Sequence, residues 1–117
     1  MNLHNQSHGP VELISLPAQL VMANAREVRA AIYDLIEDGR IHLVLDLENV
    51  EFIDSSGLSV LVSTLKAVQP LQGQVVLLRP SDGVRSLIEL TRLHQIFAIF
   101  EDRDAALREL DPQREAG

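Results

Sequence analysis

Residues 43–58 read Leu-Val-Leu-Asp-Leu-Glu-Asn-Val-Glu-Phe-Ile-Asp-Ser-Ser-Gly-Leu, and this stretch decides how the chain folds. Its beginning belongs to a nearly continuous apolar run, residues 41–47, which is typical of a central strand covered on both faces. Its end opens an amphipathic helix whose apolar residues recur at helical spacing through residue 68. Residues 54–56, an aspartate and two serines, therefore lie where a strand leads into a helix N-terminus. The unpaired N–H groups and the dipole at such an end favour an anion, including a phosphate attached to serine.

The same alternation of strand and helix continues on both sides of this stretch. Further strands are expected at residues 11–16, 74–78 and 96–100, with extended structure at residues 20–22. Four helices are expected, and the residues suited to cap their starts are Asn24, Asp54 or Ser55, Ser81 or Asp82, and Asp102. Gly39 suits the position after the first helix. The pattern predicts an α/β fold in which a mixed, mostly parallel sheet of four or five strands packs with about four helices.

Composition limits the possible classes of protein. A length of 117 residues predicts one domain, which we place at residues 10–111, between a loose polar lead at residues 1–9 and a flexible end at residues 112–117. Apolar residues make up 46% of the chain but aromatic residues only 3%, so the core is expected to be aliphatic. A net charge of −7 argues against binding to nucleic acid or anionic lipid. With no cysteine, no signal segment and no membrane-spanning apolar run, we expect a cytoplasmic protein.

The sequence offers little for catalysis, and we expect no catalytic residue, metal or cofactor. The Gly-x-Ser-x-Gly elbow and the glycine-rich nucleotide motifs are absent, and so short a fold leaves little room for a substrate cleft. His4 and His8 are four residues apart but lie in the expected tail, His42 falls inside a strand, and His94 follows the third helix. The carboxylates that surround the central stretch lack a matching ligand set and are expected to be solvated; they are Asp46, Glu48, Glu51 and Asp54.

Residues 52–58, followed by Val60 and Leu61, resemble the signature of STAS domains, the bacterial anti-sigma factor antagonists. The resemblance extends over about residues 10–110. Residues 41–47 resemble the family's strand before the signature, residues 73–78 the strand after it, and residues 84–93 the third helix and its exit.

This resemblance implies a function in partner switching. In the family, an unphosphorylated antagonist binds an anti-sigma factor that is also a serine kinase, and the complex dissociates when the kinase phosphorylates the first serine of the motif. A PP2C-type phosphatase restores the antagonist. By this resemblance Ser55 is the phosphate acceptor, and Asp54, Ser56, Gly57 and Leu58 complete the partner-binding site.

The chain departs from the family pattern at several positions. The family commonly has Leu-x-Gly-x-Leu-Asp after its first strands, whereas this chain keeps both leucines but has Ala18 and Val21. Ser59 stands in place of a glycine, and residues 91–93 read Thr-Arg-Leu in place of Ser/Thr-Gly-Leu. The missing carboxylate at Val21 makes a structural STAS subunit, docked on the ATPase of an ABC-type lipid transport system, an alternative function. An enzyme with Ser55 as its nucleophile is a third hypothesis.

Overall fold

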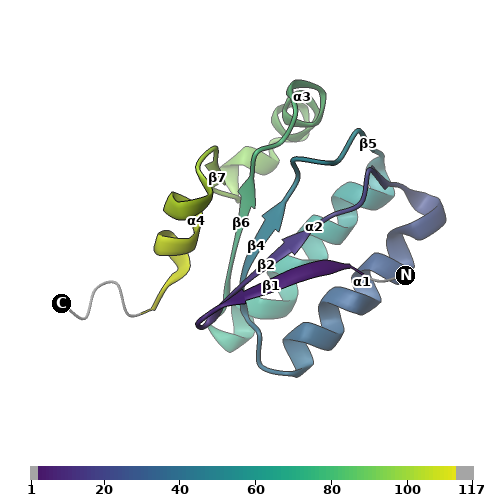
Figure 1. Ribbon diagram of the computed structural model, residues 1–117. Coiled ribbons are helices and arrows are strands. Elements are labelled where there is room, and N and C mark those ends of the chain that lie inside the picture. Colours follow the sequence, from purple (N-terminus) through teal and green to yellow (C-terminus); the bar gives the residue numbers. More distant parts are fainter. Residues whose placement is uncertain (1–2, 113–117) are drawn as a thin grey trace.

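A five-stranded sheet forms the centre of the protein. The computed structural model describes residues 3–112, and within them the strands lie side by side in the order β1-β2-β4-β6-β7 (Figure 1). Their bounds are β1 (His4–His8), β2 (Val11–Ser15), β4 (His42–Asp46), β6 (Gln74–Leu78) and β7 (Ile99–Phe100). β1 runs antiparallel to β2, and every other neighbouring pair is parallel. The α/β fold with a mixed, mostly parallel sheet is confirmed.

Helices cover both faces of this sheet. In the described residues they are α1 (Met22–Glu37), α2 (Ser55–Val68), α3 (Asp82–Leu90) and α4 (Arg103–Leu110). α1 and α2 lie on one face and α4 on the other, whereas α3 lies beyond one end of the strands (Figure 1). In β4 the side chains of Leu43 and Leu45 pack with the buried residues of α1 and α2, while Val44 packs with those of α4. Burial from both sides is why the three middle residues of β4, 43–45, are all apolar.

The core is aliphatic, as its composition predicts, with Phe97 as the buried aromatic residue of the described chain. Several helix ends are also confirmed. Ser81 and Asp102 accept hydrogen bonds from backbone N–H groups in the first turns of α3 and α4, and Gly39 follows α1 with a φ of +90°.

Two boundaries differ from the prediction. α1 begins at Met22, and Asn24 acts from inside its first turn, where its Oδ1 accepts the N–H of Val21 at 3.0 Å. The extended segment before α1 is therefore limited to β3 (Gln19–Leu20), which pairs in parallel with β5 (Phe52–Ile53) in a separate two-stranded sheet. The last strand is shorter than expected, because Ile96 and Phe97 donate their N–H groups to the carbonyl of Leu93 and continue the turn that Leu93–Gln95 begin.

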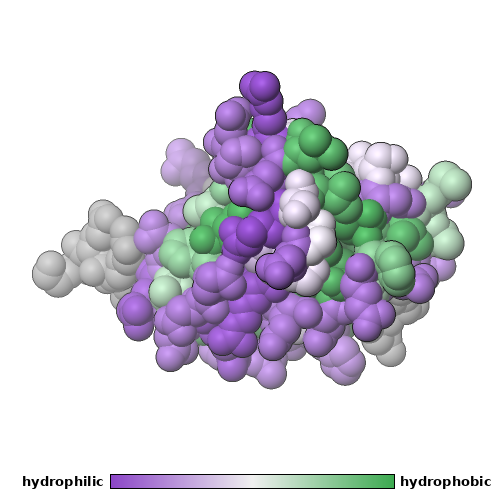
Figure 2. Space-filling view, turned by 90° about the horizontal axis from the view of Figure 1, so that it is seen from above, coloured by the Kyte–Doolittle hydropathy of each residue, from purple (hydrophilic) through white to green (hydrophobic). Residues whose placement is uncertain are grey.

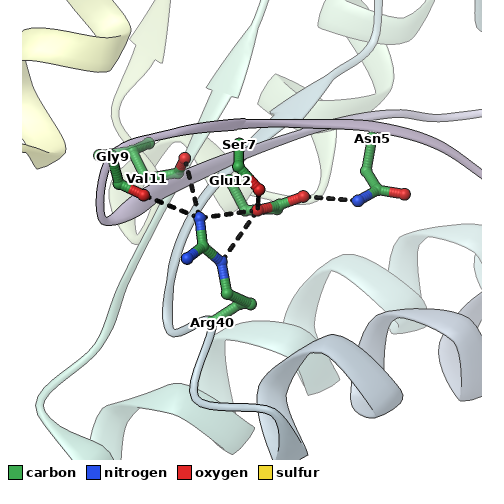
Figure 3. A network of polar contacts seen from close by, with 6 residues as sticks. All are labelled: Asn5, Ser7, Gly9, Val11, Glu12 and Arg40. Atoms are coloured by element: carbon green, nitrogen blue, oxygen red, sulfur yellow. Dashed lines mark hydrogen bonds and ion pairs between the residues drawn. The ribbon is translucent and has the colours of Figure 1, made fainter.

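The expectation of a loose polar lead is wrong for His4–His8, which form β1 at the edge of the sheet. The reason lies in Glu12, whose side chain is only 1% exposed (Figure 3). Its carboxylate accepts hydrogen bonds from Asn5 Nδ2 at 2.5 Å and Ser7 Oγ at 2.7 Å, both on β1, and from Arg40 Nε at 2.9 Å. Residues 1–2 and 113–117 of the expected flexible ends lie outside the described residues.

This network holds Glu12 in its charged form. Burial by itself raises the pKa of Glu12, but the hydrogen bonds from Asn5 and Ser7 and the Arg40 guanidinium outweigh it and lower the pKa below the usual glutamate range. Arg40 also donates to the carbonyl of Gly9 at 2.9 Å. The polar edge strand is thus fixed to β2 and to the segment after α1 by one buried carboxylate.

A second close contact joins α2 to the small sheet. Gly57 lies in the first turn of α2, and a Cβ atom there would collide with the carbonyl oxygen of Leu20 and lie 2.7 Å from Cγ1 of Ile53. Gly83 also lies in the first turn of its helix, α3, and has nothing within 4 Å of such an atom. Only a glycine lets the start of α2 approach β3 this closely.

Glu12→Gln is expected to lower the free energy of unfolding by about 1–3 kcal/mol, because it removes the charge that Arg40, Asn5 and Ser7 satisfy. Since the folded-state pKa is depressed, the contribution is complete above the ordinary glutamate pKa and disappears as the pH falls through the folded-state value. The difference between wild type and variant, measured by urea denaturation, therefore shrinks as the pH falls below about 4.5.

Glu48→Gln is the matched control, because Glu48 pairs with Arg79 at 3.6 Å with both side chains exposed. It should change stability by less than about 0.5 kcal/mol. Equal effects of the two substitutions would contradict the role given to Glu12.

Gly57→Ala is expected to destabilise the protein by about 2–3 kcal/mol, since the collision is with backbone and cannot be relieved by a side-chain rotation. Gly83→Ala is expected to stabilise it by about 0.5–1 kcal/mol, because it adds a methyl group in open space and improves helix propensity. Thermal melts of the two variants should shift in opposite directions, and a shift in the same direction would refute the contact.

Candidate functional site

The signature lies where β5 leads into α2, and Asp54 organises it. Asp54 is the N-cap of α2, and its Oδ1 accepts the N–H of Gly57 at 2.9 Å. Its Oδ2 accepts the N–H of Met22, the first residue of α1, also at 2.9 Å. One carboxylate therefore caps α2 and anchors the start of α1. The N–H groups of Gly57 and Met22 hold the pKa of Asp54 below its usual value, so the cap stays charged at neutral pH.

Ser55 follows as the first residue of α2 and is exposed, whereas Ser56 and Leu58 are half-buried and Gly57 is buried. Within residues 3–112 the Ser55 hydroxyl makes no hydrogen bond, so it is free to meet a partner. The five predicted site residues thus share one turn, and Ser55 is the more exposed of its two serines.

Nothing at this turn activates Ser55 as a nucleophile. The Asp54 carboxylate is occupied by two backbone N–H groups and, with its lowered pKa, is a poor general base. His42 is at the opposite end of β4, and among the described residues no histidine lines the groove that contains Ser55. No group of three residues that could hold a metal ion occurs in the described part of the chain.

The position of Val21 explains how the site tolerates the loss of the family's carboxylate. Val21 is the N-cap residue of α1 and has no side-chain acceptor, yet its own N–H and that of Met22 are both bonded. Asn24 accepts the N–H of Val21, and Asp54 accepts that of Met22. The contact between Met22 and Asp54 joins residues 32 apart in the chain, and no local pattern in the sequence indicates it.

An exposed apolar area surrounds the signature. Met22 is 77% exposed, and its N–H bonds to Asp54. Phe52 is 63% exposed and lies two residues before Asp54 in the sequence. Seen from above, hydrophobic side chains gather on one half of this end of the molecule and hydrophilic ones on the other (Figure 2). Large apolar side chains that cluster on a surface mark interaction sites. The sequence places Met22 in an expected extended segment and Phe52 in the signature, and neither pattern predicts that the two side chains are exposed.

A groove runs along the outer face of α2 from Ser55. Its volume is about 550 Å³, and it is lined by Arg29 of α1, by Thr91 and Leu93 after α3, and by an exposed stripe of α2 that ends at Lys66. The expectation that so short a fold leaves little room for a cleft is wrong, because three segments distant in sequence form this one together.

Among the described residues, no helix has the length and apolar character needed to cross a membrane.

Comparison with known proteins agrees with this geometry. Residues 2–106 match the model of the STAS domain. The anti-sigma F factor antagonist of Paenibacillus polymyxa is 27% identical over 112 residues, which cover 95% of this chain and 96% of that protein.

Solved structures share the fold. The crystal structure of an anti-sigma factor antagonist from Mycobacterium paratuberculosis superposes with a TM-score of 0.83 at 28% identity, covering 93% of this chain and 92% of that one. SpoIIAA of Bacillus has the same fold at 20% identity. Its unphosphorylated form gives a TM-score of 0.80 and covers 92% of this chain and 95% of its own, and its phosphorylated form gives 0.74 and covers 94% and 100%. With the signature at the start of α2 and a family model that matches almost the whole length, the chain belongs to the STAS domain family.

Proposed function

We propose that this protein is an anti-sigma factor antagonist that phosphorylation of Ser55 switches off. The observation that carries the proposal is the exposed, unbonded Ser55 hydroxyl at the N-terminus of α2, beside the exposed apolar side chains of Met22 and Phe52. The names of its relatives support the type of partner, an anti-sigma factor.

Phosphorylation of Ser55 acts on the complex and not on the fold. It adds a charge of about −1.5 to −2, which the N–H groups and the dipole at the start of α2 tolerate. In a close interface the same group must lose its water and displaces apolar contacts. A loss of about 3 kcal/mol at the interface lowers the affinity roughly a hundredfold, while the domain stays folded.

In this cycle the partner is an anti-sigma factor that is also a serine kinase, and a PP2C-type phosphatase restores the free serine. In this proposal the protein is the substrate of the kinase and of the phosphatase, and Ser55 is the group that they modify. The other four residues of the signature position the acceptor: Asp54 and Gly57 fix the first turn of α2, and Ser56 and Leu58 pack beside it.

A structural subunit of an ABC-type lipid transport complex is the second candidate, and Val21 is the reason to consider it. Val21 is a weak reason for this alternative, because Asp54 accepts the N–H of Met22 and the start of α1 is anchored without a carboxylate at position 21. A co-purified ATPase in place of a kinase would favour this second candidate.

The test is to incubate the protein with the serine-kinase anti-sigma factor of the same genome and ATP, and to locate phosphate by mass spectrometry. Phosphate is expected on Ser55 alone. Ser55→Ala should bind the kinase as wild type does but remain bound when ATP is added, and Ser55→Glu should bind roughly tenfold or more weakly.

Gln74→Glu adds the same formal charge at the exposed start of β6, far from the signature, and should leave binding within about twofold. A protein that carries no phosphate on Ser55, and whose binding Ser55→Glu does not change, is not a phosphorylation switch.

A further inference from the structure

The groove beside Ser55 has the length of a short helix. Its stripe on α2 runs from Ser55 to Lys66, a distance of about 16 Å along the helix axis, which equals about three turns. α1 runs parallel to α2, because Met22 bonds to Asp54 at one end and Tyr33 Oη donates to the Ser63 carbonyl at 3.4 Å further along. Arg29, one turn before Tyr33, therefore lies beside the middle of the stripe.

The floor of the groove is apolar. Leu58, Val62 and Leu93 line it and are half-buried, so part of each side chain still faces water. Serine and threonine side chains complete the lining; they are Ser55, Ser59, Ser63 and Thr91. An open groove of this kind, apolar along its floor and polar along its rims, fits the apolar face of an amphipathic helix.

The charge of the groove is opposite to that of the protein. Among the described residues, the charged ones that line it are Arg29 and Lys66, both cations, although the chain has a net charge of −7. Within residues 3–112 neither cation makes an ion pair or a side-chain hydrogen bond, and Arg29 Nε is buried without a partner. By contrast Arg40, Arg79 and Arg85 each pair with a glutamate. The groove therefore offers two uncompensated positive charges beside an apolar floor.

We infer that this groove binds an amphipathic helix of the partner protein, one whose apolar stripe is bordered by aspartate or glutamate. The identity of that partner as the anti-sigma factor rests on the proposed function. The inference also adds a reason for release, because Ser55 is at the end of the groove. A phosphate there places about two negative charges next to an acidic ligand.

The test uses two labelled helical peptides of about 14 residues that share leucines at helical spacing and differ in their flanking charges, one with glutamates and one with lysines. Each is titrated with the full-length protein, and binding is followed by fluorescence anisotropy. The glutamate peptide is expected to bind about tenfold more tightly than the lysine peptide, with a preference that falls at high salt. Lys66→Glu should weaken binding of the glutamate peptide by about fivefold or more and reduce the preference for it. Val62→Gln should weaken binding of both peptides.

Arg108→Glu changes the net charge equally but lies on the exposed side of α4, so it should leave both affinities within about twofold. Equal binding of the two peptides, no binding, or insensitivity to Lys66→Glu overturns the inference. So does self-association of the protein that Lys66→Glu abolishes, which would assign the groove to a second copy of the chain.

These outcomes are separate from those of the Ser55 experiment. Peptide selectivity without phosphorylation of Ser55 would support the inference about the groove and contradict the proposal that phosphorylation controls binding. Phosphorylation of Ser55 without peptide selectivity would support control by phosphorylation and contradict the inference about the groove.

Discussion

The Asp54 carboxylate joins the N-termini of two helices, and the candidate site depends on this one group. One oxygen accepts an N–H of α2 and the other an N–H of α1, each at 2.9 Å. Because β3 and β5 pair immediately beside these two starts, and Gly57 lets α2 touch Leu20, the turn has little freedom to rearrange. Ser55 is thereby held at a fixed place at the start of a helix, which is the rigidity that the proposed recognition of this turn requires.

The sheet supplies the rigidity behind this turn. Burial of β4 from both faces makes its position the least adjustable in the fold, and β2 and β6 pair with it along five residues each. The functional turn is beyond the carboxyl ends of these strands, where polar and apolar side chains can be exposed at no cost to the core. A charge added there changes a surface, and the buried clusters on either side of the sheet are not involved.

Much of the fold and the place of the candidate site could be predicted from the sequence, because the patterns that indicate them lie within short stretches of the chain. Helical spacing identifies four helices, apolar runs identify β4 and β6, and the signature identifies the turn where β5 leads into α2. What the sequence could not provide depends on contacts between distant residues. β1 is polar and reads as a tail, and only the burial of Glu12 beside Asn5 and Ser7 explains why it is a strand. Asp54 reaches Met22 across 32 residues, and the groove combines side chains of α1, α2 and the segment after α3.

Position 21 shows why a motif should be evaluated by the bonds that it provides. The family's carboxylate at this place is absent, which by pattern alone suggests a damaged site. In the structure Asn24 accepts the N–H of Val21 and Asp54 accepts the N–H of Met22. Asp54 also caps α2, and the N–H groups of Gly57 and Met22 lower its pKa. Its carboxylate is therefore charged at neutral pH and bonded to the starts of both helices, with Val21 in place. The apolar Val21 leaves the surface near Ser55 with one negative charge fewer, which agrees with a groove that carries Arg29 and Lys66 and no acid. The departure from the family pattern therefore changes the charge that this end of the molecule presents to a partner, while the geometry that presents Ser55 is maintained.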